Sequence, residues 1–312
     1  MRNKRIVVTG GAGFIGSNIA RWLCDENDVI IIDNLLTGKY ENISDIADRV
    51  RFVRKDIKNL DMLRGEFESV DYVLHQAAIP SVQRSVDDPI DTNRNNVEGT
   101  LNVLVASRDC GVKRVVFASS SSVYGDDPEL PKKETFTPKP MSPYAVTKLA
   151  GEHYCNVFYE LYGLETVALR YFNVFGPGQD PNSDYAAVIP RFTKALLSGD
   201  QPVIFGDGEQ TRDFVFIQDV VRANVLACLS KVAAGKVLNI ATGKGISLNQ
   251  LLDVMAKVTD LKISPIYEDP RAGDIRDSVA DISKAKDILG YEPMEGMENG
   301  LRAMLSEGVI EA

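Results

Sequence analysis

Short apolar runs alternate with longer amphipathic stretches along the first half of the chain. Val, Ile, Leu and Phe dominate six of these runs, and polar or glycine residues stand at their ends, which is typical of buried β-strands. The runs cover residues 5–10, 28–34, 50–56, 70–78, 114–120 and 165–173. Helix-length stretches between such strands predict an α/β fold, a doubly wound parallel sheet with helices on both faces. In such sheets, ligands bind beyond the carboxyl ends of the strands.

The pattern changes from about residue 171 onward. Residues 175–190 are rich in turn formers, residues 201–220 mix short strands with glycine turns, and residues 247–260 have the spacing of an amphipathic helix. We therefore predict two domains, 1–171 and 172–312. The second is smaller, of mixed α/β type, and closes over the carboxyl edge of the sheet. Part of 213–241 is expected to rejoin the first domain.

Composition narrows the classes of function. The 312 residues carry a net charge of −9 and no basic stripe or tail, so nucleic acid is not an expected partner. Neither a membrane span nor a secretion signal is expected, because no apolar run has the required length or flanks. Four cysteines that are far apart predict reduced thiols in a cytoplasmic protein. With two histidines, no metal site is predicted.

A glycine-rich turn follows the first predicted strand. Gly10, Gly13 and Gly16 are spaced by three, so the backbone can approach a pyrophosphate that the amides of the next helix attract. The alternative is an ordinary glycine-rich turn. Asp33 ends the second strand, where a carboxylate accepts hydrogen bonds from an adenosine ribose and repels a 2′-phosphate. No arginine follows it directly, so the predicted cofactor is NAD and not NADP; the alternative is a turn cap.

Tyr144 and Lys148 lie four positions apart in a stretch with helical spacing, residues 141–154. The two side chains therefore share one face of a helix. A free tyrosine has a pKa of about 10, and a neighbouring ammonium favours its phenolate. The pair is either an acid/base unit or a surface pair without consequence.

The glycine turn, Asp33, "NNVEGT" (95–100), "SSSSVYG" (119–125) and "YAVTK" (144–148) occur in this order. Together they resemble the extended short-chain dehydrogenases/reductases and, more narrowly, the nucleoside-diphosphate-sugar 4-epimerases. "YFNVFGPGQDP", "GDGEQTRDF" and "RAGDIRDS" extend the resemblance into the second half of the chain. The resemblance implies a Rossmann-like domain that holds NAD and a smaller domain that holds a UDP-sugar.

The resemblance also implies roles for individual residues. Tyr144 is the expected acid/base, Lys148 also holds the nicotinamide ribose, and Ser120 hydrogen-bonds the reacting sugar oxygen. Which hydroxyl of 119–122 points inward stays open, since the serines can also be a polar strand end. Other cofactor contacts are expected from Gly10, Gly13, Phe14, Ile15, Gly16, Asp33, Asn34, Thr37, Gly38, Asp56, Ile57, Gln76, Ala77, Ala78, Asn95 and Phe172. Other substrate contacts are expected from Ser81, Ser121, Asn173, Ala187, Val188, Val203, Phe205, Arg212, Arg271, Asp274 and Ser278.

Several of these residues also have a purely structural explanation that involves no ligand. Asn95 is equally well explained as a helix cap and Phe205 as a core residue, while Arg212 or Arg271 alone suits a solvated surface. Pro80 stands where the family often has a cofactor-binding lysine, which removes one expected contact.

Two further positions bear on the reaction. Related dehydratases carry an acidic residue where this chain has Ser121 and Ser122, so dehydration, which needs a general acid there, is disfavoured. In relatives restricted to non-acetylated sugars, a bulky residue such as tyrosine stands at the position of Ser278. We therefore predict an NAD-dependent 4-epimerase of UDP-N-acetylglucosamine and UDP-N-acetylgalactosamine that works through a transient 4-keto sugar. UDP-glucose and UDP-galactose are expected to be slower substrates.

Three alternatives to this reaction stay open. They are a UDP-glucuronate 4-epimerase in which Arg84 pairs with the substrate carboxylate, a nucleotide-sugar dehydratase, and a non-catalytic NAD-sensing protein. Apolar residues on more than one face of the helices at 95–110 and 144–162, together with the resemblance, also imply a homodimer through a four-helix bundle. The other reading is that both faces are buried within one chain.

Overall fold

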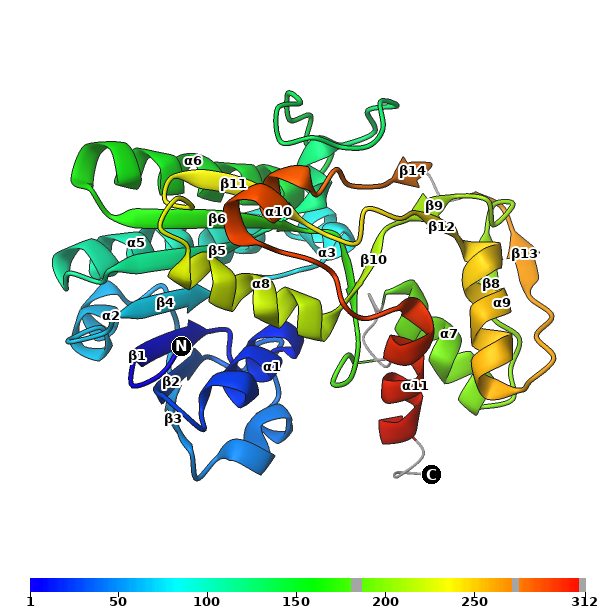
Figure 1. Ribbon diagram of the computed structural model, residues 1–312, viewed down its shortest axis with the longest axis horizontal. Helices are drawn as coiled ribbons and strands as arrows, with labels where there is room; N and C mark the ends of the chain where they lie inside the picture. Colours follow the sequence, from blue (N-terminus) through cyan, green and yellow to red (C-terminus); the bar gives the residue numbers. More distant parts are fainter. Residues whose placement is uncertain (181–186, 271–274, 309–312) are drawn as a thin grey trace.

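A seven-stranded parallel sheet is the centre of the larger part of the molecule (Figure 1). The structure, a computed structural model, describes residues 1–180, 187–270 and 275–308. In these residues the strand order is β11-β6-β5-β4-β1-β2-β3. The strands are β1 (Arg5–Thr9), β2 (Asp28–Asp33), β3 (Val50–Arg54), β4 (Tyr72–His75), β5 (Arg114–Ser120), β6 (Glu165–Tyr171) and β11 (Lys236–Ile240).

All six strands expected in the first half are therefore present. β3 differs from the expectation in one respect, because its residues are exposed or only half-buried. The reason is its position at the edge of the sheet, where it has a single neighbour, β2. The other edge strand, β11, pairs with β6 although it follows 64 residues later in the chain. The predicted division at residue 171 itself stays a prediction.

Alternate residues of the strands pack on opposite faces of the sheet. Ile6 and Val8 belong to the apolar cluster that includes α1 (Phe14–Leu23) and α8 (Ile217–Leu229). Val7 belongs to the cluster on the other face. That face is covered by α2 (Leu60–Glu66), α5 (Gly99–Asp109) and α6 (Pro143–Tyr162). The arrangement is the predicted Rossmann-like fold.

Helix α6 contains the stretch predicted to be helical and has clear end signals. Ser142 accepts a hydrogen bond from the Ala145 amide, Pro143 occupies the first helical position, and Gly163 ends the helix in the left-handed region. Before it in the chain lie η1 (Tyr40–Ile46), α3 (Val82–Asp87), α4 (Pro89–Asn93), the π-helical turn η2 (Arg94–Glu98) and η3 (Ser121–Tyr124).

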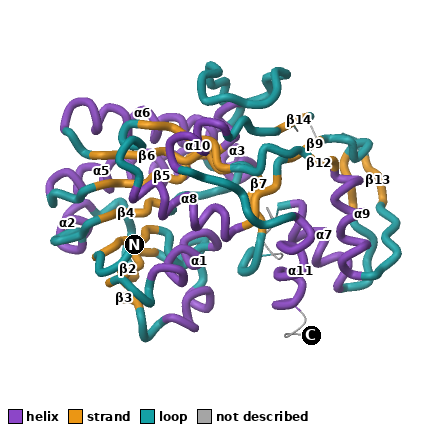
Figure 2. Tube along the Cα trace, in the orientation of Figure 1, coloured by secondary structure: helices purple, strands orange, loops and turns teal. Residues whose placement is uncertain are grey.

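The smaller part of the molecule combines short strands with three helices in the described residues (Figure 2). Its sheets are β10-β7, β12-β9-β14 and β13-β8. Their strands are β7 (Asn173–Phe175), β8 (Val203–Phe205), β9 (Thr211–Arg212), β10 (Phe214–Phe216), β12 (Ile246–Ser247), β13 (Ile266–Glu268) and β14 (Asp277–Ser278). The helices are α7 (Val188–Leu197), α9 (Leu248–Thr259) and α11 (Met297–Gly308), whereas α10 (Ser283–Leu289) packs against β11 and α8 of the larger part.

Three of the four thiols, those of Cys24, Cys155 and Cys228, are buried, whereas Cys110 is half-buried, and none forms a disulfide. Within 1–180, 187–270 and 275–308, no helix combines the length and the apolar character needed to cross a bilayer. Side chains of His, Cys, Asp and Glu in the same ranges form no group of three or more suited to a metal ion.

Candidate active site

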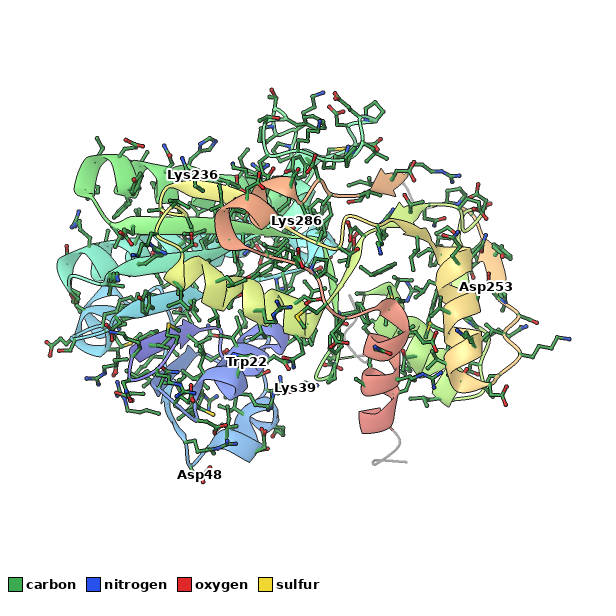
Figure 3. All side chains as sticks on the ribbon, in the orientation of Figure 1. Trp22, Lys39, Asp48, Lys236, Asp253 and Lys286 are labelled. Carbon is green, nitrogen blue, oxygen red and sulfur yellow. The ribbon has the colours of Figure 1, made fainter. Side chains whose placement is uncertain are left out.

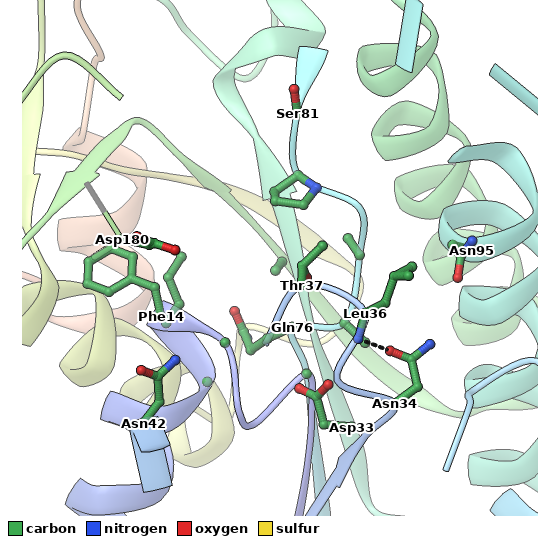
Figure 4. Close-up of a pocket in the computed structure, with 18 of the residues that line it drawn as sticks. Phe14, Asp33, Asn34, Leu36, Thr37, Asn42, Gln76, Ser81, Asn95 and Asp180 are labelled. Carbon is green, nitrogen blue, oxygen red and sulfur yellow. Dashed lines mark hydrogen bonds between the residues drawn. The ribbon is translucent and has the colours of Figure 1, made fainter. Parts of the chain in front are cut away.

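A cavity of about 740 Å³ lies at the carboxyl ends of the sheet strands. Its lining comes from the segments that follow β1, β2, β3 and β4, from the ends of β5 and β6, from α6, and from the loop after β7. Figure 4 shows the part between Phe14, Asp33, Gln76 and Ser81. The volume lies within the range of small-molecule and cofactor sites, and the position is the one that the strand pattern predicts.

The glycine turn forms the floor of this cavity. Gly10 has a φ of +68°, and a Cβ there would lie 2.6 Å from the Ala77 amide nitrogen. A Cβ on Gly16 would collide with the backbone of Gly10 and Gly11, so the start of α1 can pack closely on β1 only without side chains. At Gly13, no side chain caps α1. The first turn of the helix therefore presents its amides and its positive dipole toward the cavity.

Asp33 borders the cavity at the end of β2. Its Oδ2 accepts a hydrogen bond from the Ala12 amide at 3.0 Å, and its Oδ1 accepts one from Leu35 at 2.8 Å. Burial raises the pKa of this carboxyl, while the two amide hydrogen bonds lower it. Asp33 therefore does cap the turn that follows β2. Each carboxylate oxygen still has capacity for a further donor, so capping and ribose binding are compatible.

Tyr144 and Lys148 share the inner face of α6 and both line the cavity. Lys148 is 4% exposed, and its Nζ donates to the carbonyl oxygen of Ala118 at 2.8 Å. The same Nζ lies 5.7 Å from the centre of the Tyr144 ring. The Ser120 side chain lies close enough to the Tyr144 phenol to lower its pKa. The surface-pair interpretation is thus wrong for this lysine, which is buried inside the site.

Burial shifts the proton affinities of both groups. It raises the pKa of Tyr144 to about 12, against the lowering effect of the Ser120 hydrogen bond. It lowers the pKa of Lys148 to about 8. Both shifts favour the neutral form, as desolvation does. The position of Lys148 therefore does not bring the pKa of the Tyr144 phenol below its ordinary value.

The chain matches the family model described as the NAD dependent epimerase/dehydratase family over residues 6–241. The chain belongs to this family. A putative UDP-glucose 4-epimerase of Methanocaldococcus jannaschii is 41% identical over 304 residues, which cover 96% of this chain and 97% of that protein. A UDP-N-acetylglucosamine 4-epimerase from Methanobrevibacter ruminantium M1, solved in complex with UDP-N-acetylmuramic acid, is 44% identical. The alignment with that structure covers 100% of both chains, with a TM-score of 0.96.

NAD is the cofactor of this family, and a UDP-glucose 4-epimerase from Thermus thermophilus has been solved in complex with NAD. That structure is 37% identical, has a TM-score of 0.87, and aligns over 99% of this chain and 100% of its own. The cavity suits NAD on three counts: a glycine turn without room for Cβ atoms, an uncapped helix amino terminus, and a carboxylate at the end of β2. A bound nicotinamide ring would add positive charge to the cavity that Tyr144 lines, and such a charge favours the ionised form of a phenol.

Most of the predicted cofactor residues of this family member line the cavity. They are Gly10, Gly13, Phe14, Ile15, Gly16, Asp33, Asn34, Thr37, Ile57, Gln76, Ala77, Ala78, Asn95, Tyr144 and Lys148. Gly38, Asp56 and Phe172 lie outside the lining. Asp56 accepts a hydrogen bond from the Asn34 side chain, and Phe172 packs against Tyr124 in a separate apolar cluster. Asn95 lies in η2 and donates to Asp91, so it is not a helix cap.

The predicted substrate residues are more dispersed. Ser81 and Ala187 line the cavity, and Ser81 also caps α3. Phe205 borders a separate open depression with Tyr267, Glu268 and Asp269. Ser120, Ser121, Asn173, Val188, Val203, Arg212 and Ser278 are not in the lining of either hollow. Arg271 and Asp274 lie outside the described residues.

Several lining residues were missed by the sequence analysis. Tyr171 donates to Gln76 Oε1 at 3.3 Å and contacts Asn224 Oδ1 at 3.1 Å. Lys39, on the side of the larger part that faces the smaller part (Figure 3), forms an ion pair with Asp180 at 2.7 Å. Both contacts join segments more than 90 residues apart. Local pattern carries no signal for such pairs, although Lys39 directly follows the predicted Gly38.

Proposed function

We propose that this chain, a UDP-sugar 4-epimerase, interconverts UDP-N-acetylglucosamine and UDP-N-acetylgalactosamine, with UDP-glucose and UDP-galactose as slower substrates. The observation that carries the proposal is the small side chain of Ser278. Ser278 is half-buried in β14, in register with Arg212 of β9. In relatives restricted to non-acetylated sugars a bulky residue such as tyrosine stands at this position, and its phenol is expected to occupy space that an N-acetyl group needs while the sugar turns over. The whole-chain similarity to a UDP-N-acetylglucosamine 4-epimerase supports the same substrate class.

In the proposed reaction, Tyr144 removes the proton of the 4-hydroxyl and later returns it to the oxygen on C4, after the sugar has turned so that C4 is reduced on its opposite face. The Ser120 side chain, which lowers the pKa of the phenol, is assigned the role of orienting the sugar oxygen. Lys148 holds the cofactor ribose and adds positive charge beside the phenol. When bound, NAD supplies the acceptor and then the donor of the C4 hydride, so the reaction has no net change of redox state. The sugar rotates about its bond to the diphosphate between the two proton transfers.

The substrate class is tested by incubating the purified protein with a panel of UDP-sugars and separating the products by chromatography. We expect conversion of the N-acetylated pair. Ser278→Tyr should lose activity on the N-acetylated pair and keep activity on UDP-glucose. Ser278→Ala, which keeps the space open, is the control and should retain both activities. Equal loss on both pairs in Ser278→Tyr, or a parent protein inactive on UDP-N-acetylglucosamine, would contradict the proposal.

A second candidate is epimerisation of UDP-glucuronate, which Arg84 favours. Arg84 lines the same cavity as Tyr144, and its nearest carboxylate, on Asp91, is 3.9 Å from Nη2. A guanidinium in this position suits a sugar carboxylate. If Arg84 has this role, UDP-glucuronate is converted faster than both other pairs, and Arg84→Gln reduces that conversion selectively.

We also propose that the chain forms a homodimer through α5 and α6. Val157 is 41% exposed and Leu161 is 71% exposed on the outer face of α6. Phe158 differs, because it is buried within the chain. Two apolar side chains exposed on one helix face fit a helix pair contributed by a second copy. Light scattering should give twice the chain mass, and Leu161→Glu should shift the mass toward that of a monomer.

A further inference from the structure

Three side-chain contacts join the inner face of α6 to the last three residues of β5. Lys148 donates to the carbonyl of Ala118, the Ser119 hydroxyl donates to Glu152, and the Ser120 side chain lies close enough to Tyr144 to lower the pKa of its phenol. Tyr144, Lys148 and Glu152 are spaced by four, so they form one row along the helix. Two members of this row have roles in the proposed reaction, and Glu152 has none so far.

Glu152 is itself held by an ion pair. Arg170 donates from Nε to Oε1 at 2.9 Å and from Nη2 to Oε2 at 2.8 Å, and both side chains are 5% exposed or less. Arg170 lies on β6 directly opposite Ser119 in the strand register. Its guanidinium also lies 4.7 Å from the centre of the Tyr124 ring. Glu152 is thus fixed from β6 and reaches β5 through a single hydroxyl.

The buried ion pair, which joins α6, β6 and β5, carries a cost in solvation free energy. Charges removed from water lose solvation, and an apolar pair of similar size is often equally stable or more stable. A bidentate pair, in contrast, fixes the carboxylate in one orientation. Glu152 can therefore accept from Ser119 only when β5 ends at one position relative to α6. Because Ser120 is the next residue of β5, the contact of Ser119 with Glu152 also fixes the distance between Ser120 and Tyr144.

We propose that Glu152 is a positioning residue of the active site, which, held by Arg170, fixes the end of β5 through Ser119 so that Ser120 stays aligned with Tyr144. The inference rests on the acid/base role proposed for Tyr144. It assigns Glu152 no contact with substrate or cofactor. The cavity lining contains Ser119, Tyr144 and Lys148 but not Glu152.

The principal test replaces both charges together, in the double variant Glu152→Met/Arg170→Met. This variant leaves no buried charge unpaired, so it is expected to fold. We expect kcat to fall about 10- to 100-fold, as small misplacements of reacting groups do, with KM and NAD content unchanged. The pH profile of kcat should also move to higher pH, because a weaker Ser120 hydrogen bond raises the pKa of Tyr144. Parent-like kcat in the folded double variant would overturn the inference.

A second test removes only the link. Ser119→Ala keeps the ion pair and deletes the hydroxyl, whereas Ser119→Thr keeps a hydroxyl in a strand position. Ser119→Ala should reproduce the loss of kcat and the alkaline shift, and Ser119→Thr should restore both. Equal activity of the two variants would contradict the positioning role. Arg114→Met is the matched control, since it breaks the ion pair at the other end of the same two strands and should leave the pH profile of kcat unchanged.

A third measurement separates this inference from the proposed function. The pKa of the Tyr144 phenol can be followed by NMR in protein labelled with ¹³C at the tyrosine ring carbon that bears the hydroxyl, with NAD bound and without a sugar. Tyr144→Phe assigns the signal. A higher pKa in Ser119→Ala than in Ser119→Thr supports the inference even if no UDP-sugar is converted. The same pKa in both variants overturns it whatever the substrate is.

Discussion

The two ends of the β5–β6 pair carry similar groups in different surroundings. At the amino ends, Arg114 and Glu165 face each other in register, with Nη2 and Oε2 2.6 Å apart. Arg114 also donates to the carbonyls of Ala227, Cys228 and Ser230 at the end of α8. At the carboxyl ends, the ion pair of Arg170 and Glu152 lies beside a cavity, and Lys148 is buried next to it with its pKa lowered.

The two ends differ in the partners of their charged groups. The guanidinium of Arg114 donates to carbonyl oxygens at the end of a helix, which otherwise lack hydrogen-bond partners. This ion pair therefore stabilises the packing of the helix end on the sheet. The charged groups at the carboxyl ends are arranged around a space that a ligand fills. The β5–β6 pair thus has a stabilising amino end and a reactive carboxyl end. Substitutions at the amino end should lower the free energy of unfolding and leave kcat unchanged, whereas substitutions at the carboxyl end should mainly lower kcat.

The largest expected effect is the loss of turnover in Tyr144→Phe. The variant keeps the ring and loses the hydroxyl, and removal of an acid/base group reduces kcat about 10²- to 10⁴-fold. NAD content, measured after denaturation of the purified protein, should match that of the parent. Near-parent turnover would show that Tyr144 is not the acid/base.

The second effect concerns the amino ends. Arg114→Met leaves Glu165 and three carbonyls without their donor, so the free energy of unfolding should fall by about 2–3 kcal/mol, below the range for a fully buried pair because Glu165 is 37% exposed. Chemical denaturation measures the loss, and kcat should be unchanged. A decrease in kcat at temperatures where the variant is fully folded would remove the distinction between the two ends.

The third effect compares the two ends of β2. Asp33→Ala removes a carboxylate from the cavity, and a hydrogen bond to a charged group contributes about 1.5–3 kcal/mol, so NAD affinity should fall about 10- to 100-fold. Discrimination against NADP should weaken at the same time. Asp28→Ala, which breaks an exposed ion pair with Arg5 at the amino end, is the control and should not change either affinity in calorimetric titrations. Equal effects of the two variants would count against a cofactor role of Asp33.

The smallest effect is a gain in stability. Folding lowers the pKa of Lys148 from 10.5 to about 8. Below pH 8 the lysine is charged in both the folded and the unfolded chain, so the whole free-energy cost of burying the ammonium is present. This cost disappears as pH rises through the ordinary pKa of lysine. Lys148→Met should raise the free energy of unfolding at pH 7 by about 1 kcal/mol, after allowance for the lost hydrogen bond to Ala118. The gain should vanish at pH ~9 and reverse at higher pH, and turnover should be lost. A less stable variant at pH 7 would show that the lysine is not strained by burial.

The sheet could be predicted from the sequence because its strands are continuous apolar runs, and the glycine turn, Asp33 and Tyr144 could be predicted because their spacing is local. The prediction that β3 is buried was wrong because Arg51 and Arg54 stand among its apolar residues, a pattern that suits an edge strand. Glu152 shows the other limit. It looks like an ordinary charge on an amphipathic helix, and only the register of Ser119 with Arg170 reveals its partners.

The position of β11 has a consequence for synthesis of the chain on the ribosome. Residues 165–171 emerge well before residues 236–240, yet these two segments are hydrogen-bonded neighbours in the sheet. Until the later segment has left the exit tunnel, β6 presents an open edge that can pair with other nascent chains. A chaperone that shields this edge, or slow translation of the intervening 64 residues, would thus change the yield of folded protein without changing its final stability.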